Sequence, residues 1–511
     1  MSSSDNEDPL TVADVAGTGP EGGRGGSPRA GPQVRRSLIL SFAERYASII
    51  VNVLATTLLA RLLTPQDYGI YTVGVVVVGF ASTLGDFGVV SFLTQEKNLT
   101  ESQVRTAFGI SILIGLVMGM AIALSSGWVA DFYGSAGLRT VLLVLSINFV
   151  LQPFGYAVLA LLRREMNFAA MFWISLGSTI VNLVASIGLA LYGQGYMSLA
   201  WGSLAGSVVL CAMASALRPK GIRLSPSLRN WRPITSFGLV AMAGILVNSI
   251  GSRMPELVIG RLLGVSAVGL FGRADGITTM FNRMVTGAVA PVVISTFAMQ
   301  HRMGDPLKEN FLNGIALMTG IGWPFFAFLA LMTSPIFHIL FGYGWDQAIP
   351  IGRVLCIAAS IVMMADLNGM AIQATGAMKW NLIAHLIIQP VAVVLVIVSA
   401  QFNLLVVAAG QIVTAAVTVV VFYRIIDRLI GVSLGDVIRR SAKSAGVTLC
   451  SIIAPIIVVS LMRTDPSHVW TPLIIAAAGT AAGWLIGVLL FRHDLRKEIL
   501  TMAAKVSPRF A

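Results

Sequence analysis

Charged side chains stand within several long apolar stretches of this chain, and arginine is prominent among them. In a membrane such a charge costs about 2.5–3.5 kcal/mol on insertion scales, so it usually faces a water-filled cavity or a partner. The arginine fork stays ionised when dehydrated and donates paired hydrogen bonds to phosphate. These positions therefore predict a cavity that binds an anionic group. The predicted cavity residues, including two amides, are Arg45, Asn52, Arg253, Arg273, Asn282 and Arg283.

Carboxylates occupy the same apolar stretches. They would either tune the charge of the arginines or bind a coupling cation, Na⁺ or H⁺. A second interpretation stays open, in which these charges are ion pairs that fix helix packing. Arg253 and Glu256, three positions apart on one helix face, fit that interpretation. The carboxylates are Glu44, Asp86, Glu256, Asp275 and Asp366.

Motifs of catalysis and metal binding are missing from the sequence. The five histidines have no ligand spacing, and no nucleophile elbow, phosphate loop or HExxH motif occurs. Cys211, Cys356 and Cys450 lie in apolar runs and are interpreted as packing residues. We therefore expect no enzyme activity, no catalytic residue, no metal site and no cofactor besides a coupling ion.

The elements that must position the charges are membrane helices. Hydrophobic residues make up 56% of the 511 and charged residues only 11%, against about 25% in soluble domains. About fourteen apolar segments are each long enough to cross a hydrocarbon core of about 30 Å. Backbone groups in lipid must bond within their own segment, so the predicted fold is an all-α polytopic membrane protein. The segments lie near 37–60, 68–93, 104–129, 138–161, 167–191, 196–217, 236–260, 267–299, 310–333, 349–374, 380–400, 404–427, 441–462 and 471–491.

The basic residues indicate how the chain is oriented. Most of the 35 Lys and Arg residues fall in the two tails and in every second loop if the N-terminus is cytoplasmic. This asymmetry follows the positive-inside rule and predicts that both termini are cytoplasmic. It also accounts for the net charge of +12, so anionic membrane lipids are expected partners and nucleic acid is not.

One stretch occurs twice, 200 positions apart. Residues 61–71 read RLLTPQDYGIY, and residues 261–271 read RLLGVSAVGLF. Each copy lies between two apolar runs at the predicted outer membrane surface, so its expected role is to anchor and turn equivalent helix pairs. The repeat predicts two six-helix lobes followed by an added pair. The expected parts are a disordered tail (1–36), the N-lobe (37–217), a cytoplasmic linker (218–235), the C-lobe (236–427), a second linker (428–440), the added pair (441–492) and a cytoplasmic tail (493–511).

The placement of the charges within the lobes predicts one shared cavity. They gather on the first two segments of each lobe and on the tenth segment, 349–374. The second linker alternates apolar and basic residues, which is typical of a short helix lying on the membrane surface.

Three stretches resemble the polysaccharide transporter family, whose members are Wzx-type flippases of the multidrug/oligosaccharidyl-lipid/polysaccharide exporter superfamily. They are LLARLLTPQDYGIYTVG (58–74), GDFGVVSFLTQ (85–95) and FGYGWDQAIP (341–350). The resemblance implies a fourteen-helix fold of two lobes around a cavity that opens to one side and then the other. It also implies a location in the bacterial inner membrane.

The substrate that this resemblance implies is an undecaprenyl-pyrophosphate-linked oligosaccharide, moved outward for surface polysaccharide assembly. A polysaccharide polymerase and chain-length proteins are the further partners that it implies. Moving two negative charges out of an inside-negative cell is downhill by about 2.3 kcal/mol per charge per 100 mV.

Other classes remain as alternatives. A cation-coupled multidrug exporter of the same superfamily would use carboxylates rather than arginines in its cavity. A polymerase or ligase would need a large outer loop, whereas the predicted outer loops are short. A major-facilitator transporter is disfavoured by the loop TQEKNLTESQ (94–103), which lacks that family's Gly/Asp/Arg pattern.

Overall fold

Helices form the secondary structure throughout the described parts of the chain. The computed structural model describes residues 49–85, 89–96, 99–218, 225–227, 253–281, 286–461 and 470–496. No strand occurs within these ranges, which confirms the predicted all-α class. Ten helices there are long and apolar enough to cross a membrane, and Ile49–Leu62 is a shorter apolar helix. The first and seventh predicted segments begin outside these ranges, so the count of fourteen stays a prediction.

The helices gather in two compact units. The first unit comprises residues 1–63 and 73–249, and the second comprises residues 64–72 and 250–511. The boundary at 249/250 lies within the predicted segment 236–260, and the added helix pair belongs to the second unit. Helix α2 (Pro65–Gly85) departs from this division, because it begins in the second unit and continues in the first.

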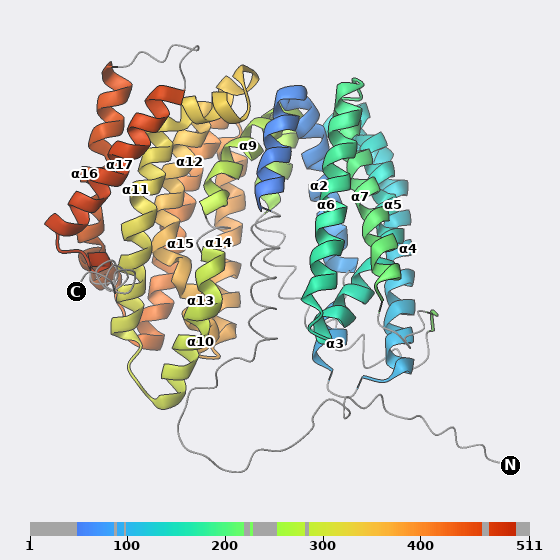
Figure 1. Ribbon diagram of the computed structural model, residues 1–511, viewed down its shortest axis with the longest axis horizontal. Coiled ribbons are helices and arrows are strands. Elements are labelled where there is room, and N and C mark those ends of the chain that lie inside the picture. The colour runs from blue at the N-terminus through green and yellow to red at the C-terminus, as the bar shows by residue number, and fades with distance from the viewer. Residues whose placement is uncertain are drawn as a thin grey trace, which may run out of the picture. The chain divides into compact units, whose positions relative to one another are not determined.

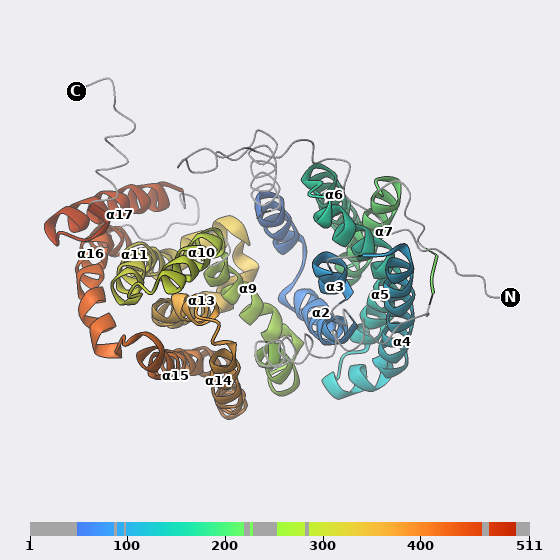
Figure 2. The ribbon, with the colours of Figure 1, turned by 90° about the horizontal axis from the view of Figure 1, so that it is seen from below.

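The first unit is a group of long helices packed side by side. Helix α5 contacts α4 and α7, and α7 contacts α6 (Figures 1 and 2). At the start of α4, the backbone N–H groups of Thr100 and Gln103 each donate to the other residue's side chain. This capping box satisfies two donors that a helix start leaves free. Besides α2 and the helix Ile49–Leu62, the described helices are α3 (Val89–Gln95), α4 (Glu101–Tyr133), α5 (Ala136–Arg164), α6 (Phe168–Leu191) and α7 (Tyr196–Ala216).

The second unit is built around a long helix, α11. It packs against α12, α16 and α17, while α15 packs against α12 and α14 (Figures 1 and 2). An apolar cluster that includes Phe311, Ile372 and Ile426 joins α11, α13 and α15. A helix over 253–262 is followed by α9 (Val265–Phe281), α10 (Gly287–Met303), α11 (Lys308–Leu340), η3 (Tyr343–Ala348), α12 (Ile349–Val362), η4 (Met363–Ala365), α13 (Asp366–Ala374), α14 (Met378–Ser399), α15 (Leu404–Ile430), α16 (Leu434–Leu461) and α17 (Trp470–Leu490).

Two predicted segments of the second unit are interrupted. The segment expected at 267–299 comprises α9 and α10, with residues 282–285 outside the described ranges. The segment expected at 349–374 changes to a 3₁₀ turn at η4 before it resumes as α13. The hydroxyl of Tyr423 donates to the carbonyl of Met364 inside this turn. A 3₁₀ turn within a helix often marks a functional hinge.

The added pair, α16 and α17, is joined by a glycine seam. A Cβ atom on Gly479 or Gly483 would overlap Ala454 or the carbonyl oxygen of Cys450 on α16. Small residues every fourth position let membrane helices approach closely and gain dispersion contacts. The residues of the seam on α17 are Gly479, Gly483 and Gly487.

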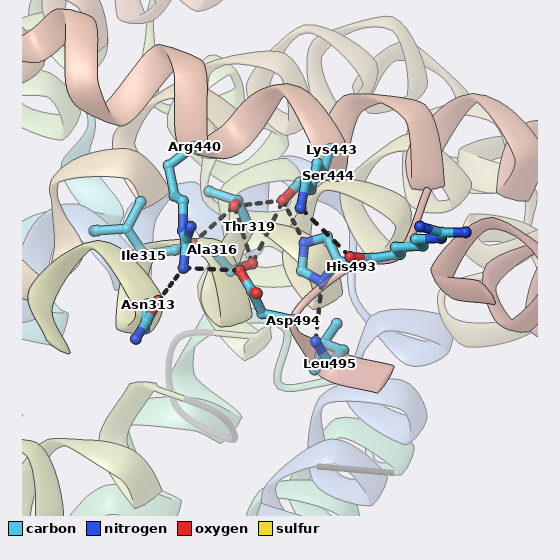
Figure 3. A network of polar contacts seen from close by, with 11 residues as sticks. Asn313, Ile315, Ala316, Thr319, Arg440, Lys443, Ser444, His493, Asp494 and Leu495 are labelled. Carbon is cyan, nitrogen blue, oxygen red and sulfur yellow. Dashed lines mark hydrogen bonds and ion pairs between the residues drawn. The ribbon is translucent and has the colours of Figure 1, made fainter. Parts of the chain in front are cut away.

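A polar network holds this pair against α11 (Figure 3). The backbone N–H of Leu495 donates to Nδ1 of His493 (3.2 Å), so the neutral ring carries its hydrogen on Nε2 and donates to Ser444 Oγ (3.0 Å). Ser444 also contacts Thr319 Oγ1 of α11 at 2.9 Å. Arg440 lies 3.2 Å from a carboxylate oxygen of Asp494. His493 and Leu495, shortly after α17, are thus buried inside the second unit.

The connection expected at 428–440 is shorter in the structure. Helix α15 runs to Ile430 and α16 begins at Leu434. The backbone N–H of Ser433 donates to Asp436 Oδ2, and that of Asp436 donates to Ser433 Oγ, both at 3.2 Å. This reciprocal cap starts α16 early, so the residues expected to form a separate surface helix are its first turns.

Candidate functional site

The second unit contains a cavity of about 250 Å³ with carboxylates in its wall. Glu256 comes from the helix over 253–262, Asp275 from α9 and Asp366 from the first residue of α13. Three of the predicted charge-tuning or ion-coupling residues therefore meet at one cavity, although they are far apart in the sequence. Its other lining residues include Thr278, Thr279, Gln411, Thr414 and Thr418.

Polar groups that sequence reasoning missed come from α15. Gln411, Thr414 and Thr418 line the cavity. The hydroxyl of Thr414 donates to the carbonyl of Gly410 (3.2 Å), and that of Thr418 donates to the carbonyl of Thr414 (2.8 Å). Their side-chain oxygens therefore keep lone pairs that can accept a proton or a cation. The spacing i, i+3, i+7 on one helix face was the signal that could have found them.

Asp366 stands where the tenth predicted segment breaks. The hydroxyl of Thr286 lies 3.4 Å from Asp366 Oδ2, within reach of a weak hydrogen bond. The 3₁₀ turn η4 directly precedes Asp366, so a rotation there would move the carboxylate relative to α12. Glu256 Oε2 and Gln411 Nε2 are buried with no hydrogen-bond partner among the described residues. The cavity thus holds polar atoms that a bound ion or water would satisfy.

Arg253 lies on the helix that carries Glu256 but is not among the residues that line the cavity. The ion pairs within 4.0 Å in the described ranges join Lys308 to Asp436, His338 to Asp346 and Arg440 to Asp494. A direct Arg253–Glu256 pair is absent from them. The two residues interact electrostatically at longer range, so the packing-pair interpretation stays a prediction.

Arg273 lies in an aromatic cage rather than in the cavity wall. Its guanidinium carbon is 3.5 Å from the centroid of the Tyr68 ring, 5.5 Å from that of Trp345 and 5.6 Å from that of Phe341. The Arg273 Nε atom is buried without a hydrogen-bond partner among the described residues. Cation–π contacts with the rings therefore stabilise its charge.

The remaining predicted site residues are distributed differently. Asn52 is exposed on the helix Ile49–Leu62 of the first unit and does not line the cavity. No group of three His, Cys, Asp or Glu within the described ranges could hold a metal ion. The residues that lie outside those ranges are Glu44, Arg45, Asp86, Asn282 and Arg283.

Solved structures with the same arrangement of helices define the class of protein. The fold is similar to a lipid II flippase, MurJ, in an inward closed conformation, with a TM-score of 0.73 and 12% identity over 90% of this chain and 99% of that one. It is also similar to an inward-facing multidrug resistance MATE transporter of the MOP superfamily, with a TM-score of 0.60 and 17% identity over 79% of this chain and 98% of the other. The chain therefore has the multi-helix membrane fold shared by these transporters.

The sequence then identifies the family. Residues 58–350 match the model of the polysaccharide biosynthesis protein family, and the chain belongs to that family. It is 24% identical over 495 residues to the succinoglycan biosynthesis transport protein ExoT of Rhizobium meliloti, covering 94% of this chain and 97% of ExoT. It is 23% identical over 344 residues to the lipopolysaccharide biosynthesis protein WzxC of Escherichia coli, covering 66% of this chain and 70% of WzxC. The expected resemblance to Wzx-type polysaccharide transporters is confirmed.

Proposed function

We propose that this protein is a flippase that moves an undecaprenyl-pyrophosphate-linked oligosaccharide to the outer leaflet of the bacterial inner membrane. The observation that carries the proposal is a lipid II flippase fold over 90% of a chain that belongs to the polysaccharide biosynthesis protein family. Lipid II and this cargo share a large polar head on a long lipid tail. Both termini are proposed to be cytoplasmic, which the placement of the basic residues supports.

The head group is proposed to meet arginines on its way. Arg45, Arg253 and Arg283 are the candidates for pyrophosphate or acidic sugar, because a guanidinium pairs with phosphate even when water is excluded. Arg273 is not included, because aromatic rings already surround its guanidinium. The membrane potential would drive two negative charges outward with about 2.3 kcal/mol per charge per 100 mV.

The carboxylate-lined cavity is proposed to couple transport to a cation. Glu256, Asp275 and Asp366 provide negative charge, and the oxygens of α15 provide neutral ligands. Such a set suits a proton or a Na⁺ ion. Because Asp366 follows a 3₁₀ turn, occupancy of the cavity would bias the angle between α12 and α13.

The test is transfer in proteoliposomes. A fluorescent undecaprenyl-pyrophosphate disaccharide is incorporated, and its leaflet is read by quenching with an impermeant reagent while H⁺ and Na⁺ gradients are imposed separately. We expect protein-dependent transfer, reduced when Arg253 and Arg283 are both replaced by Ala. Transfer no faster than in protein-free liposomes would overturn the proposal. Efflux of ethidium without transfer of the lipid-linked sugar would identify a multidrug exporter instead.

A further inference from the structure

The two copies of the repeated stretch pack against each other in the second unit. A Cβ atom added to Gly69 would overlap the carbonyl oxygen of Val265, and one added to Gly269 would overlap that of Pro65. Each added atom would also lie 3.3 or 3.1 Å from the backbone nitrogen of the opposite glycine. The starts of α2 and α9 therefore cross at backbone contact, and only glycine fits at the crossing.

The aromatic cage lies next to this crossing. Arg273 is four residues after Gly269, one turn along α9, and Tyr68 directly precedes Gly69 on α2. The Tyr68 ring is 9% exposed and meets the Trp345 ring edge to face, with centroids 5.5 Å apart. The first copy of the repeat thus contributes a ring, Arg273 follows the second copy by two residues, and both side chains lie against Trp345 of the η3 turn.

The η3 turn, which carries Trp345, is also held to α11 by contacts that do not involve Tyr68. Trp345 is 1% exposed, and Asp346 Oδ1 lies 2.7 Å from Nε2 of His338 on α11. The rings of His338 and Tyr343 are 4.4 Å apart. The η3 turn is therefore a rigid backing for Tyr68, so the weaker part of the assembly is the contact that α2 makes with it.

Helix α2 is shared between the two units. Its first turns, through Thr72, belong to the second unit, and its remainder belongs to the first. The repeated stretch is predicted to lie at the outer membrane surface, because Arg61 and Arg261 stand at the ends opposite to most basic residues. A change of access on that side must either bend α2 or separate Gly69 from Gly269.

We infer that Tyr68, Gly69, Gly269 and Arg273 form a latch that closes the outer side of the transporter and opens for release of cargo. This role rests on the proposed function in one respect, since cargo release presupposes transport. In the latch, Arg273 is a positioning residue that holds α2 through the Tyr68 ring. The two copies of the repeat then form one contact that opens, rather than a pair of unrelated turns.

The first experiment measures the contact between the starts of α2 and α9 directly and needs no cargo. Gln66 and Ser266, equivalent positions in the two copies, are both exposed, so each can be replaced by Cys and spin-labelled after Cys211, Cys356 and Cys450 are changed to Ala. Pulsed electron paramagnetic resonance then gives the distance distribution between the labels. We expect a short distance in the parent protein.

Two variants should open the latch and two should leave it closed. Tyr68→Leu should raise the ratio of long to short distances by about tenfold, as loss of one desolvated cation–π contact predicts. Gly69→Ala should shift the ratio in the same direction, because its Cβ would overlap the carbonyl oxygen of Val265. Tyr68→Phe keeps the ring and should keep the short distance. The control is Gly272→Ala on α9, three residues after Gly269, where an added Cβ meets nothing within 4 Å. Identical distributions in Gly69→Ala, Tyr68→Leu and Gly272→Ala, all eluting as folded protein, would overturn the latch.

The second experiment tests whether the latch must open. The Cys pair at positions 66 and 266 is joined by a bifunctional maleimide, and transfer of the fluorescent undecaprenyl-pyrophosphate disaccharide is measured in proteoliposomes. Joined protein should lose transfer, while singly labelled protein keeps it. Full transfer in joined protein would refute the gating role. Absence of transfer in singly labelled and unlabelled protein would instead refute the proposed function and leave the distance result to decide the latch.

Discussion

The guanidinium carbon of Arg273 lies 3.5 Å from the centroid of the Tyr68 ring, although the two residues are more than 200 positions apart. An arginine inside an apolar stretch predicts an anion site, because guanidinium and phosphate pair well. Here the face of the cation is already covered by a π system, which stabilises the charge without an anion. The cage supports the positioning role that we propose for Arg273, and anion binding by the other arginines remains part of the proposed function.

Removing the backing of the cage should destabilise the second unit. Trp345→Ala deletes a side chain that is 1% exposed and contacts Tyr68, and Trp→Ala at such sites costs about 3–5 kcal/mol. We expect a clear fall in the melting midpoint of the detergent-solubilised protein. Trp470→Ala, at a residue that is 62% exposed, is the control and should change the midpoint much less. Equal shifts in both variants would contradict the packing role of Trp345.

The glycine seam between α16 and α17 should not tolerate a larger residue. Gly483→Val places a Cβ atom on the carbonyl oxygen of Cys450, and such overpacking costs about 1–3 kcal/mol. The melting midpoint should fall accordingly. Gly127→Val makes the same change on α4, where an added Cβ meets nothing within 4 Å, and should be nearly neutral. A midpoint for Gly483→Val that matches the Gly127→Val control would show that the two helices are not in close contact.

Acid should loosen the network that holds the added pair. Burial lowers the pKa of His493 below its usual 6.5, Lys443 and Arg440 lower it further, and Asp494 opposes them. The unfolded segment therefore binds a proton below about pH 6.5 that the folded segment excludes. This contribution to the free energy of unfolding is complete above that pH and decreases as the pH falls below it. A proton on Nδ1 would also displace the N–H of Leu495 (Figure 3).

Melting midpoints measured between about pH 7.5 and pH 5.5 check this dependence. The midpoint of the parent protein should drop toward the acid end, and that of His493→Gln should drop less. The exposed His301 supplies the control, because His301→Gln should retain the parent's acid dependence. An acid-induced drop in His493→Gln as large as in the parent would assign the effect to another group.

Neutralising a cavity carboxylate should uncouple transport from the cation gradient. Asp366→Asn and Glu256→Gln each remove a negative charge from the cavity wall. The ratio of transfer with the cation gradient to transfer without it should fall about tenfold, a size typical of coupling between two sites. The measurement is proteoliposome transfer with and without an imposed H⁺ or Na⁺ gradient. Asp305→Asn changes an exposed residue between α10 and α11 and should leave the gradient response intact. An unchanged response in both cavity variants would refute coupling at this cavity.

Hydropathy alone determined the all-helical class and the bounds of most membrane segments. Helices α4 to α7, α11 and α14 to α17 begin and end within a few residues of the expected positions, except for the earlier starts of α4 and α16 and the later end of α11. Hydrogen bonds inside a helix are local, and the thickness of a bilayer sets the length of each apolar run, so neighbouring residues contain the necessary information. The grouping of Glu256, Asp275 and Asp366 was likewise foreseen in outline, because intramembrane charges seek a shared polar space.

Only the tertiary structure decided which charged group faces which surroundings. The sequence treats Arg253 and Arg273 alike, yet one lies on the helix that carries Glu256 and the other is enclosed by Tyr68, Phe341 and Trp345. The copies of the repeat were recognisable as related turns, but their contact through Gly69 and Gly269 was not. Side-chain direction and close backbone approach depend on how distant helices cross, and that crossing is set by packing across the whole unit rather than by local spacing.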